Sequence, residues 1–531
     1  MRRIKKSFKN RRSQSLPTQN DQIKNKEQFS ENLKENIQIV KEALGNSDDI
    51  IIREISIGKE SSIKAGIIYT EGLIDTPSIQ NFILESLMLD VQDSGLDKSI
   101  TNKKDLLQLM KDSVLTVGDL TDITDYSTLF TSLLSGSVII LLDGYTQGFA
   151  ISMKGGKDRG VTEATTESTV RGPKEAYSES LRTNTALLRR KVNDRNLWLE
   201  TKKIGTVTKT DVSIAYIKNI ANDKVVEEVR RRLDRIEIDG ILETGYIEEL
   251  IQDETYTPFP TMFTTERPDV TAANLLEGRI AIFVDGTPHS LIVPSLFVQF
   301  FQTADDYYQR ADIVTLLRIL RFIGFFIALL GPSLYIAITT FHQEMLPTPL
   351  LINLAAQREG VPFPAFIEAL MMEVTFEILR EAGVRMPRTI GQAVSIVGTL
   401  VIGTAAVDAG IVSAAMVIVV AITAISSFIV SSFNLSISVR MLRFIFMGLA
   451  ASFGLFGMIV GLIALTLHLC SLRSFGVPYM SPLAPFNIEG QKDVFIRFPH
   501  WGLFSRPRLI SQKNLKREDN PSPKPESRKR K

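Results

Sequence analysis

The sequence predicts an α/β protein joined to an α-helical membrane domain. We expect a duplicated α/β cytoplasmic N-terminal domain followed by a multi-pass helical transmembrane domain with a re-entrant or broken helix. Residues 1–290 are mostly polar and charged, whereas the following stretch contains several apolar runs long enough to span a bilayer. Between the first two runs, residues 341–388 are too charged for lipid and too apolar for a loop.

The two ends of the chain are basic, although the net charge of its 531 residues is only +2. Residues 1–12 carry seven Arg and Lys and no acid, and we expect residues 1–30 to form a disordered basic leader. No apolar stretch follows these charges, which argues against a cleaved signal peptide. Beside a membrane domain, basic ends favour cytoplasmic placement and contact with anionic lipid over binding of nucleic acid.

The polar half is expected to form two related α/β units, residues 31–160 and 161–290. A helix with one apolar face, which Ser30 can cap, opens the first unit. Residues 136–144 and 278–286 each hold a buried-strand run that ends in Asp-Gly, at Asp143 and Asp285. An internal repeat favours a scaffold or a ligand-sensing domain, although so short a similarity can also arise by chance.

We find no motif for catalysis, for a cofactor or for a metal. The Gly155-Gly156-Lys157-Asp158 turn lacks the upstream glycine and the following Ser or Thr of a phosphate-binding P-loop. The four histidines are scattered, and the single cysteine, Cys470, excludes an intramolecular disulfide and a cysteine-based metal site. We therefore expect a protein that is not an enzyme and that has no catalytic, cofactor-binding or metal site.

The transmembrane domain is expected at residues 291–475, with spans near residues 313–340, 390–407, 411–433 and 444–469. Residues 476–531 are expected to form a basic, proline-rich tail, which we place in the cytoplasm with the N-terminal domain. Four spans would put Arg385, Arg440 and Arg443 on the opposite side, against the positive-inside tendency. The number of crossings therefore stays open.

The last expected span carries small residues at spacings of four, three and four, namely Ala450, Gly454, Gly457 and Gly461. In a continuous helix these residues share one face, where they let another helix backbone approach closely. The pattern favours helix packing over a direct role in permeation.

Residues 361–379 contain three carboxylates, Glu368, Glu373 and Glu377, within an otherwise apolar run. Each acid costs about 2.5 kcal/mol at mid-bilayer, while each of the large apolar residues returns only about 0.5 kcal/mol. A lipid-exposed helix is therefore disfavoured. Glu373, Glu377 and Glu381 repeat every four residues along one helical stripe, so their mutual repulsion requires compensation. Ions in a pore or vestibule would compensate it, and so would arginines such as Arg358 and Arg385; a solvated face outside the membrane is a third alternative.

Prolines and a glycine break the backbone just before this run, at Pro347, Pro349, Gly360, Pro362 and Pro364. Broken helices at membrane depth are tolerated only where they line a cavity or pack against protein. We therefore consider a ring of several subunits, with apolar constrictions and charged vestibules. The candidate pore or gate residues of the break are Glu344, Arg358, Glu359, Val361 and Phe363.

The same region resembles the A subunit of the GerA-type spore germinant receptors of endospore-forming bacteria. The resemblance is carried by Phe341-His-Gln-Glu-Met-Leu-Pro-Thr-Pro-Leu-Leu, Ala356-Gln-Arg-Glu-Gly-Val-Pro-Phe-Pro-Ala, Glu377-Ile-Leu-Arg-Glu-Ala-Gly-Val-Arg and Gly391-Gln-Ala-Val-Ser-Ile-Val-Gly. In the polar half it extends to Leu142-Asp-Gly, Arg267-Pro-Asp and Phe300-Phe-Gln-Thr-Ala-Asp-Asp-Tyr-Tyr.

The resemblance implies a multi-pass protein of the spore inner membrane that acts with a transporter-like B subunit, which senses nutrients, and a lipoprotein C subunit. It further implies a homo-oligomer, a pentamer, that forms a nutrient-gated channel and releases monovalent cations early in germination. A non-conducting receptor scaffold or signal-transducing subunit is the alternative.

Overall fold

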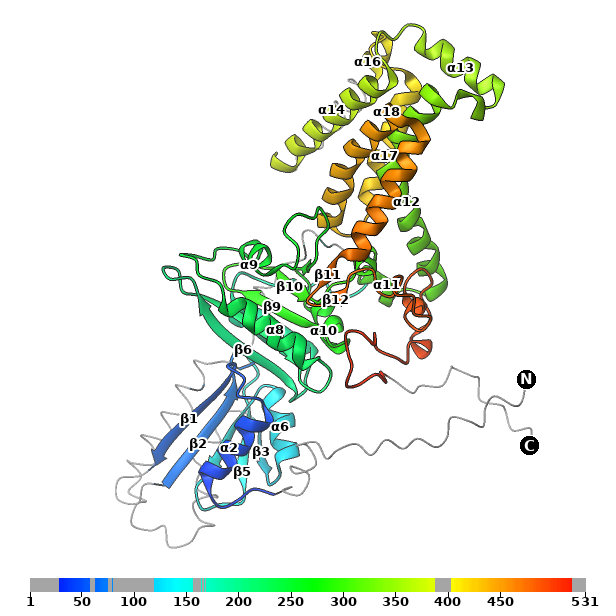
Figure 1. Ribbon diagram of the computed structural model, residues 1–531. Helices are drawn as coiled ribbons and strands as arrows, with labels where there is room; N and C mark the ends of the chain where they lie inside the picture. Colours follow the sequence, from blue (N-terminus) through cyan, green and yellow to red (C-terminus); the bar gives the residue numbers. More distant parts are fainter. Residues whose placement is uncertain are drawn as a thin grey trace, which may run out of the picture.

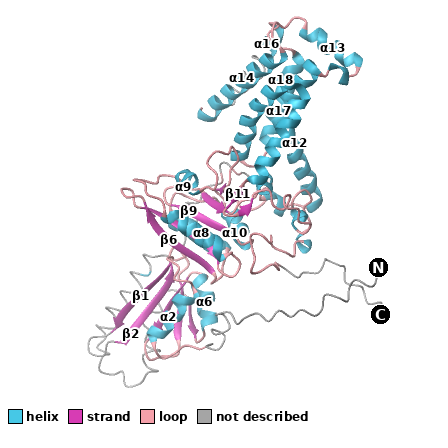
Figure 2. Cartoon of the chain, viewed as in Figure 1, coloured by secondary structure: helices cyan, strands magenta, loops and turns pink. Residues whose placement is uncertain are grey.

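The computed structural model describes residues 28–57, 63–74, 79, 119–155, 164, 167, 169–386 and 403–517. Two α/β units follow one another at the N-terminal end, and a helical half rises from the second unit (Figure 1). Helices make up nearly all of the helical half, and strands lie in the two α/β units (Figure 2). Residues 1–27 of the expected leader, most of the expected span 390–407, and residues 518–531 lie outside the described residues.

The first unit is one five-stranded antiparallel sheet, in the strand order β1-β2-β4-β5-β3. Its strands are β1 (Ile50–Ile57), β2 (Ile63–Thr70), β3 (Leu120–Ile123), β4 (Ser137–Leu142) and β5 (Gly148–Ser152). Two helices, α2 (Leu33–Ala43) and α6 (Tyr126–Leu134), pack their apolar residues on one face of this sheet. The expected helix after Ser30 is therefore present, although Asn32 caps it rather than Ser30.

The second unit repeats this topology, since its sheet has the order β6-β7-β9-β10-β8 and is antiparallel throughout. Its strands are β6 (Leu197–Ile204), β7 (Thr210–Ile217), β8 (Phe263–Thr265), β9 (Ile280–Val284) and β10 (Ser290–Val293). The helices α7 (Leu181–Lys191) and α10 (Pro268–Leu276) cover one face, and α8 (Asp223–Asp234) and α9 (Thr244–Ile251) cover the other. The expected boundary at residue 290 is wrong, because it would cut β10 from its sheet.

The two Asp-Gly turns have the same physical role in both units. Asp143 accepts a hydrogen bond from the backbone N–H of Leu33 at 3.0 Å, and Asp285 accepts one from Leu181 at 2.9 Å. Each aspartate thus satisfies a free N–H at the first turn of α2 or α7. The repeated motif therefore ties the end of a central strand to the first helix of its own unit.

A buried ion pair joins the two units. Arg189 of α7 donates to both carboxylate oxygens of Asp49, at 2.7 and 3.0 Å, and both side chains are almost fully buried. Bidentate pairing of this kind fixes orientation as well as distance. The pair holds the start of β1 against the second unit.

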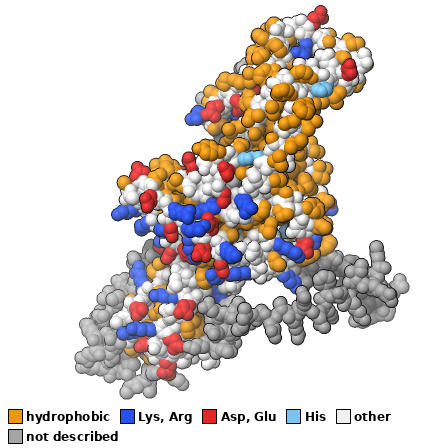
Figure 3. Space-filling model, in the orientation of Figure 1, with side chains coloured by type: hydrophobic (Ala, Val, Ile, Leu, Met, Phe, Trp, Pro, Cys, Tyr) orange, Lys and Arg blue, Asp and Glu red, His pale blue; other side chains and the backbone are white. Residues whose placement is uncertain are grey.

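The helical half begins with α11 (Asp305–Tyr308) and α12 (Ala311–Phe341). Then follow η5 (Gln343–Met345), α13 (Thr348–Arg358), α14 (Ala365–Arg385), α16 (Gly403–Asp408), α17 (Ala414–Ile429) and α18 (Phe433–Ser471). Among the described residues, α12 and α18 are long and apolar enough to cross a membrane, and α17 is a shorter apolar helix. Apolar side chains dominate the surface of this half, whereas charges gather over the α/β units (Figure 3).

The last helix differs from the expected single span 444–469. It starts earlier, at Phe433, and Gly454 has non-helical angles (φ 59°, ψ −142°). A Cβ built at Gly461 would contact Leu449 and Phe446, residues that a continuous helix would hold roughly 20 Å away. Residues 433–453 and 455–471 therefore form an antiparallel helical hairpin that turns at Gly454.

The described residues after α18 fold against the rest of the protein, in the region expected to be a basic, proline-rich tail (476–531). Strands β11 (Arg473–Ser474) and β12 (Val477–Pro478) lead into η7 (Gly490–Asp493) and η8 (His500–Gly502). The hydroxyl of Ser474 donates to the carbonyl of Thr261, and that of Ser511 donates to the carbonyl of Ile220. We call residues 472–517 the C-terminal segment; it packs on the second α/β unit. Residues 291–301, expected to open the transmembrane domain, instead belong to β10 and to a buried 3₁₀ helix, η4 (Phe297–Phe301).

Candidate functional site

The carboxylates of α14 and the arginines of α18 form the first charged layer of the helical half. α14 runs back alongside α12. Glu373 of α14 and Ala328 of α12 both accept hydrogen bonds from Arg443. Glu368, earlier on α14, contacts the start of α17. Glu373 and Arg443 form an ion pair at 2.5 Å, with the glutamate 0% and the arginine 1% exposed. Two charges withdrawn so completely from solvent are stable only as partners.

The next turn of α14 holds a second glutamate–arginine pair, which is less buried than the first. Glu377 pairs with Arg440 at 2.5 Å, and both side chains are partly exposed. Arg380 lies over the ring of Phe428 of α17, 5.1 Å from its centroid. Glu381 pairs with Arg385 on the same helix at 2.6 Å, at an exposed position. The three glutamates of the expected stripe therefore each face a different arginine.

Glu368 lies one turn earlier and holds the N-terminus of α17. Ser413, the N-cap of α17, donates its backbone N–H to Oε1 of Glu368 at 2.6 Å, and its hydroxyl donates to the same atom. Nε of Arg358 is 3.9 Å from the other oxygen, an ion pair without a direct hydrogen bond. A carboxylate at a helix N-terminus is favoured by the helix dipole.

The remaining residues of the expected pore or gate lie at the end of the helical half that is remote from the α/β units (Figure 1). Glu344, Glu359 and Phe363 are exposed there, and Val361 is half-buried. The candidate pore or gate residues therefore fall into two groups. The glutamates of α14 are paired with arginines or with the N-terminus of α17, whereas the residues near the proline-rich break are exposed or half-buried.

The small residues of α18 line the inside of its hairpin. Ala450 is buried, and Gly454 occupies the turn itself. A Cβ at Gly457 would lie 2.5 Å from the carbonyl oxygen of Leu449, so only glycine allows this approach. The expected common face of one straight helix is wrong, because Gly454 reverses the chain; these residues pack the two halves of α18 against each other.

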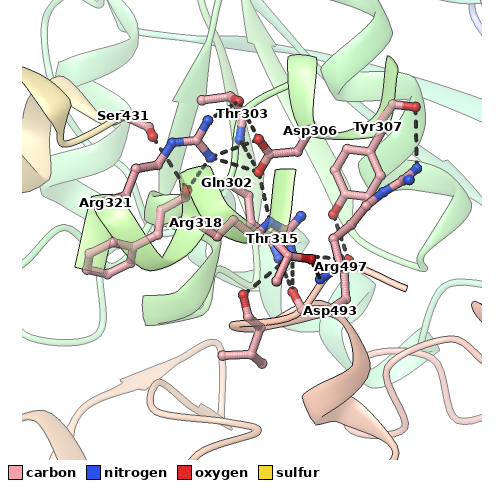
Figure 4. A network of polar contacts seen from close by, with 12 residues as sticks. Gln302, Thr303, Asp306, Tyr307, Thr315, Arg318, Arg321, Ser431, Asp493 and Arg497 are labelled. Atoms are coloured by element: carbon pink, nitrogen blue, oxygen red, sulfur yellow. Dashed lines mark hydrogen bonds and ion pairs between the residues drawn. The ribbon is translucent and has the colours of Figure 1, made fainter. Parts of the chain in front are cut away.

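A second charged layer lies at the base of α12, where the helical half meets the C-terminal segment (Figure 4). Arg318 is 2.9 Å from Asp306 and 2.7 Å from Asp493, and both Arg318 and Asp306 are 1% exposed. Arg321 also pairs with Asp306, and Tyr307 donates its hydroxyl to Asp493 at 2.7 Å. Burial raises the pKa of Tyr307 well above its ordinary range, which keeps the phenol protonated as a donor.

The second charged layer was not predicted from the sequence. Arg318 and Arg321 are part of a basic cluster at the start of a span, which by itself indicates only orientation in a membrane. Two residues of this layer, Asp306 and Tyr307, do belong to a run that carries the family resemblance, Phe300-Phe-Gln-Thr-Ala-Asp-Asp-Tyr-Tyr. Asp493 lies 175 residues after Arg318 and carried no such signal.

Neither layer resembles a catalytic or metal centre. Within the described residues, no group of three or more His, Cys, Asp or Glu is placed to hold a metal ion. Both layers hold helices in place through ion pairs and hydrogen bonds. The first layer joins α14 to α12, α17 and α18, and the second joins α12 to the C-terminal segment.

Comparison with known proteins gives consistent results over nearly the whole chain. The family model described as Bacillus/Clostridium GerA spore germination protein matches residues 16–509. Spore germination protein KA of Bacillus subtilis is 49% identical over 490 residues, which cover 92% of this chain and 89% of that protein. Spore germination protein GerLA of Bacillus cereus is 38% identical, over 91% of this chain and 96% of that protein.

One solved structure is also similar, that of the N-terminal domain of the A subunit of the Bacillus megaterium spore germinant receptor GerK3. It is 46% identical and covers 51% of this chain and 98% of that domain, with a TM-score of 0.41.

Proposed function

The chain belongs to the GerA family of spore germination proteins, as an A subunit, and on this premise we propose that it is the membrane subunit of a spore germinant receptor that oligomerises into a nutrient-gated cation channel. It would reside in the spore inner membrane, with its α/β units and C-terminal segment on the cytoplasmic side. Its partners would be a transporter-like B subunit and a lipoprotein C subunit. The apolar surface of the helical half supports membrane residence (Figure 3).

The observation that carries the channel proposal is the exposed apolar surface of the arm formed by α13 and α14. α13 has no buried side chain, and Leu350 and Ile352 on it are exposed. On α14, Val374 and Ile378 are exposed while Glu373 faces inward. A helix that turns Glu373 inward and Val374 and Ile378 outward is suited to packing this face against lipid or a second copy.

In a ring of copies, a pentamer in this proposal, the exposed group at the break would face its neighbours and the central path. Val361 and Phe363 would form the apolar constriction, and Glu344 and Glu359 would supply the acidic vestibule. Glu373 and Glu377 would keep the arm in place through their arginines and would not meet ions.

The second candidate function is a non-conducting receptor scaffold. It is favoured by the same ion pairs, because every acid from Glu368 to Glu381 has a basic or backbone partner within this one chain. In that case ions would leave the spore through another protein, and the arm would bind the partner subunits.

Measuring potassium release from germinating spores that carry Phe363→Ala or Val361→Ala distinguishes the channel from the scaffold. A channel predicts altered release or altered nutrient dependence at unchanged protein levels. Phe486→Ala, which removes an exposed aromatic of the C-terminal segment, is the matched control and should behave as wild type. Wild-type release in stably assembled Val361 and Phe363 variants would favour the scaffold.

The stoichiometry of the purified protein is the independent test. A closed ring of A subunits supports a shared central path. A single A subunit in a one-to-one complex with its partners would overturn the proposal.

A further inference from the structure

A cavity lies between the second α/β unit and the C-terminal segment. Its volume is about 100 Å³, and its walls come from the turn before β9, from residues 296–302 and from residues 481–517. The C-terminal segment is held there by Arg506, whose Nε donates to the carbonyl of Leu276 at 2.7 Å, and by Ser511, which donates to Ile220. The cavity therefore exists only because the segment folds back.

Arg279, at the start of β9, lines this cavity with unsatisfied donors. Its side chain is buried, with the residue only 4% exposed, and neither Nε nor Nη1 has a hydrogen-bond partner among the described residues. Its remaining nitrogen is 3.4 Å from Glu277, beyond the roughly 2.7–2.9 Å of a strong charge-assisted hydrogen bond. Burial lowers the pKa of this guanidinium, partly offset by the nearby Glu277, Tyr307 and Asp493. This buried cation thus has one distant carboxylate partner and two donors without a hydrogen bond among the described residues.

Positive charge is in excess around the cavity. The cations that line it are Arg279, Lys492, Arg506, Arg508 and Arg517. Among the described residues, Arg506 donates hydrogen bonds only to carbonyl and amide oxygens of Leu276, Asn514 and Lys516, and it forms no direct ion pair with a carboxylate.

The acids of the cavity are fewer and are already engaged. Asp493 is bound by Arg318 and Tyr307, and Glu489 is paired with Arg508 at 2.8 Å. Glu277 is shared between Arg279 at 3.4 Å and Arg517 at 3.8 Å, both long contacts. Five cations against three acids leave two positive charges, the complement of a compact dianion.

We propose that this cavity binds a phosphate group, held by Arg279 from the α/β unit and by Arg506 and Arg517 from the C-terminal segment. Guanidinium forks match tetrahedral oxyanions, and the volume admits a group of this size. A bound phosphate would bridge the two parts of the chain. Because Asp493 of the same segment holds Arg318 of α12, occupancy would also stabilise the base of the helical half.

The test uses the full chain in detergent, with inorganic phosphate titrated at constant ionic strength against chloride. We expect saturable binding by calorimetry and slower amide exchange in residues 490–517. Arg279→Met and Arg517→Gln should each weaken binding about tenfold or more, since each removes charge-assisted hydrogen bonds. Glu277→Gln should strengthen binding, because it removes the carboxylate that competes for Arg279 and Arg517.

Arg230→Gln is the matched control, since this arginine of α8 pairs with Glu200 and does not line the cavity. A parallel experiment places the protein in nanodiscs of phosphatidylcholine with or without phosphatidylglycerol. Protection of residues 490–517 by free phosphate assigns a soluble ligand, and protection only with phosphatidylglycerol assigns a lipid headgroup. Protection by neither, or equal binding by wild type and by the Arg279, Arg517 and Glu277 variants, overturns the proposal.

Discussion

Nε of Arg443 donates a hydrogen bond to the carbonyl oxygen of Ala328 at 2.7 Å, which joins α18 to α12. Ala328 is four residues before Pro332, and its carbonyl is therefore the one that proline, lacking an N–H, cannot satisfy within the helix. The same guanidinium pairs with Glu373. One side chain thus satisfies the free carbonyl of α12 and neutralises a fully buried carboxylate of α14.

The first prediction concerns the loss of this arginine. Arg443→Met leaves Glu373 buried without a counter-charge, so we expect a loss of about 3–5 kcal/mol in the free energy of unfolding. Adding Glu373→Gln should recover a large part, because no buried charge then remains. Denaturant unfolding in detergent measures both variants.

The matched control for this experiment is Arg385→Met. Arg385 also pairs with a glutamate of α14, but the two side chains are 79% and 63% exposed. Exposed helical pairs contribute under about 0.5 kcal/mol. Equal losses from the Arg443 and Arg385 variants would refute a structural role for the buried pair.

A second prediction tests the link between Arg443 and Pro332. Pro332→Ala supplies the N–H that the carbonyl of Ala328 lacks, so this carbonyl no longer depends on Arg443. In the Pro332→Ala background, Arg443→Met should therefore cost about 1 kcal/mol less than in wild type. A double-mutant cycle measures this coupling energy, and additive effects of the two substitutions would contradict it. Pro349→Ala, at the first turn of α13, should show no such coupling.

The third prediction concerns the turn of the α18 hairpin. Gly454 has φ 59° and ψ −142°, and a Cβ there would lie 2.8 Å from His342 and 3.0 Å from Phe341. Gly454→Ala should therefore destabilise the protein by at least about 2 kcal/mol. Gly448→Ala is the control, because Gly448 lies within a helix and nothing would contact its added Cβ. We expect that change to stabilise by roughly 0.5–1 kcal/mol. Thermal unfolding compares the two, and a harmless Gly454→Ala would exclude the sharp reversal.

The fourth prediction concerns pH and Glu167 in the second α/β unit. Burial raises the pKa of this carboxyl from 4.5 to about 7; Glu266 and Asp269 add to the rise, and Thr265 and Arg267 oppose it. Between these pH values the folded state keeps a proton that the unfolded state has lost. Stability should therefore fall as the pH rises from about 4.5 to 7, with the full loss present above 7.

Glu167→Gln removes this titration while it keeps an acceptor for the Thr265 hydroxyl, which donates to Oε2 at 2.6 Å. Amide exchange of residues 263–267 in the full chain should then vary less with pH than in wild type. Glu249→Gln, at an exposed position, should leave the wild-type pH dependence intact. Identical pH profiles for wild type and Glu167→Gln would contradict the assignment.

Local patterns predicted much of the α/β half. The Asp-Gly turns at Asp143 and Asp285 marked the repeat, because a turn motif and a buried-strand run are encoded in adjacent residues. The sequence also indicated the role of small residues in α18, but not the reversal at Gly454, since a glycine within an apolar run is compatible with a continuous helix. The fold of residues 472–517 was missed because basic, proline-rich composition is equally typical of a solvated tail.

The sequence by itself determined that apolar and charged residues divide the chain into two halves, and that the carboxylates of α14 cannot face lipid. It did so because an ionised carboxylate is costly in hydrocarbon whatever the fold of the rest of the chain. Only the tertiary structure decided what these carboxylates face. Arg443 and Arg440 lie 70 and 63 residues from Glu373 and Glu377, and no local periodicity connects them. The return of α18 on itself and the packing of α14 against α12 bring these charges together, and such contacts are decided by the whole chain.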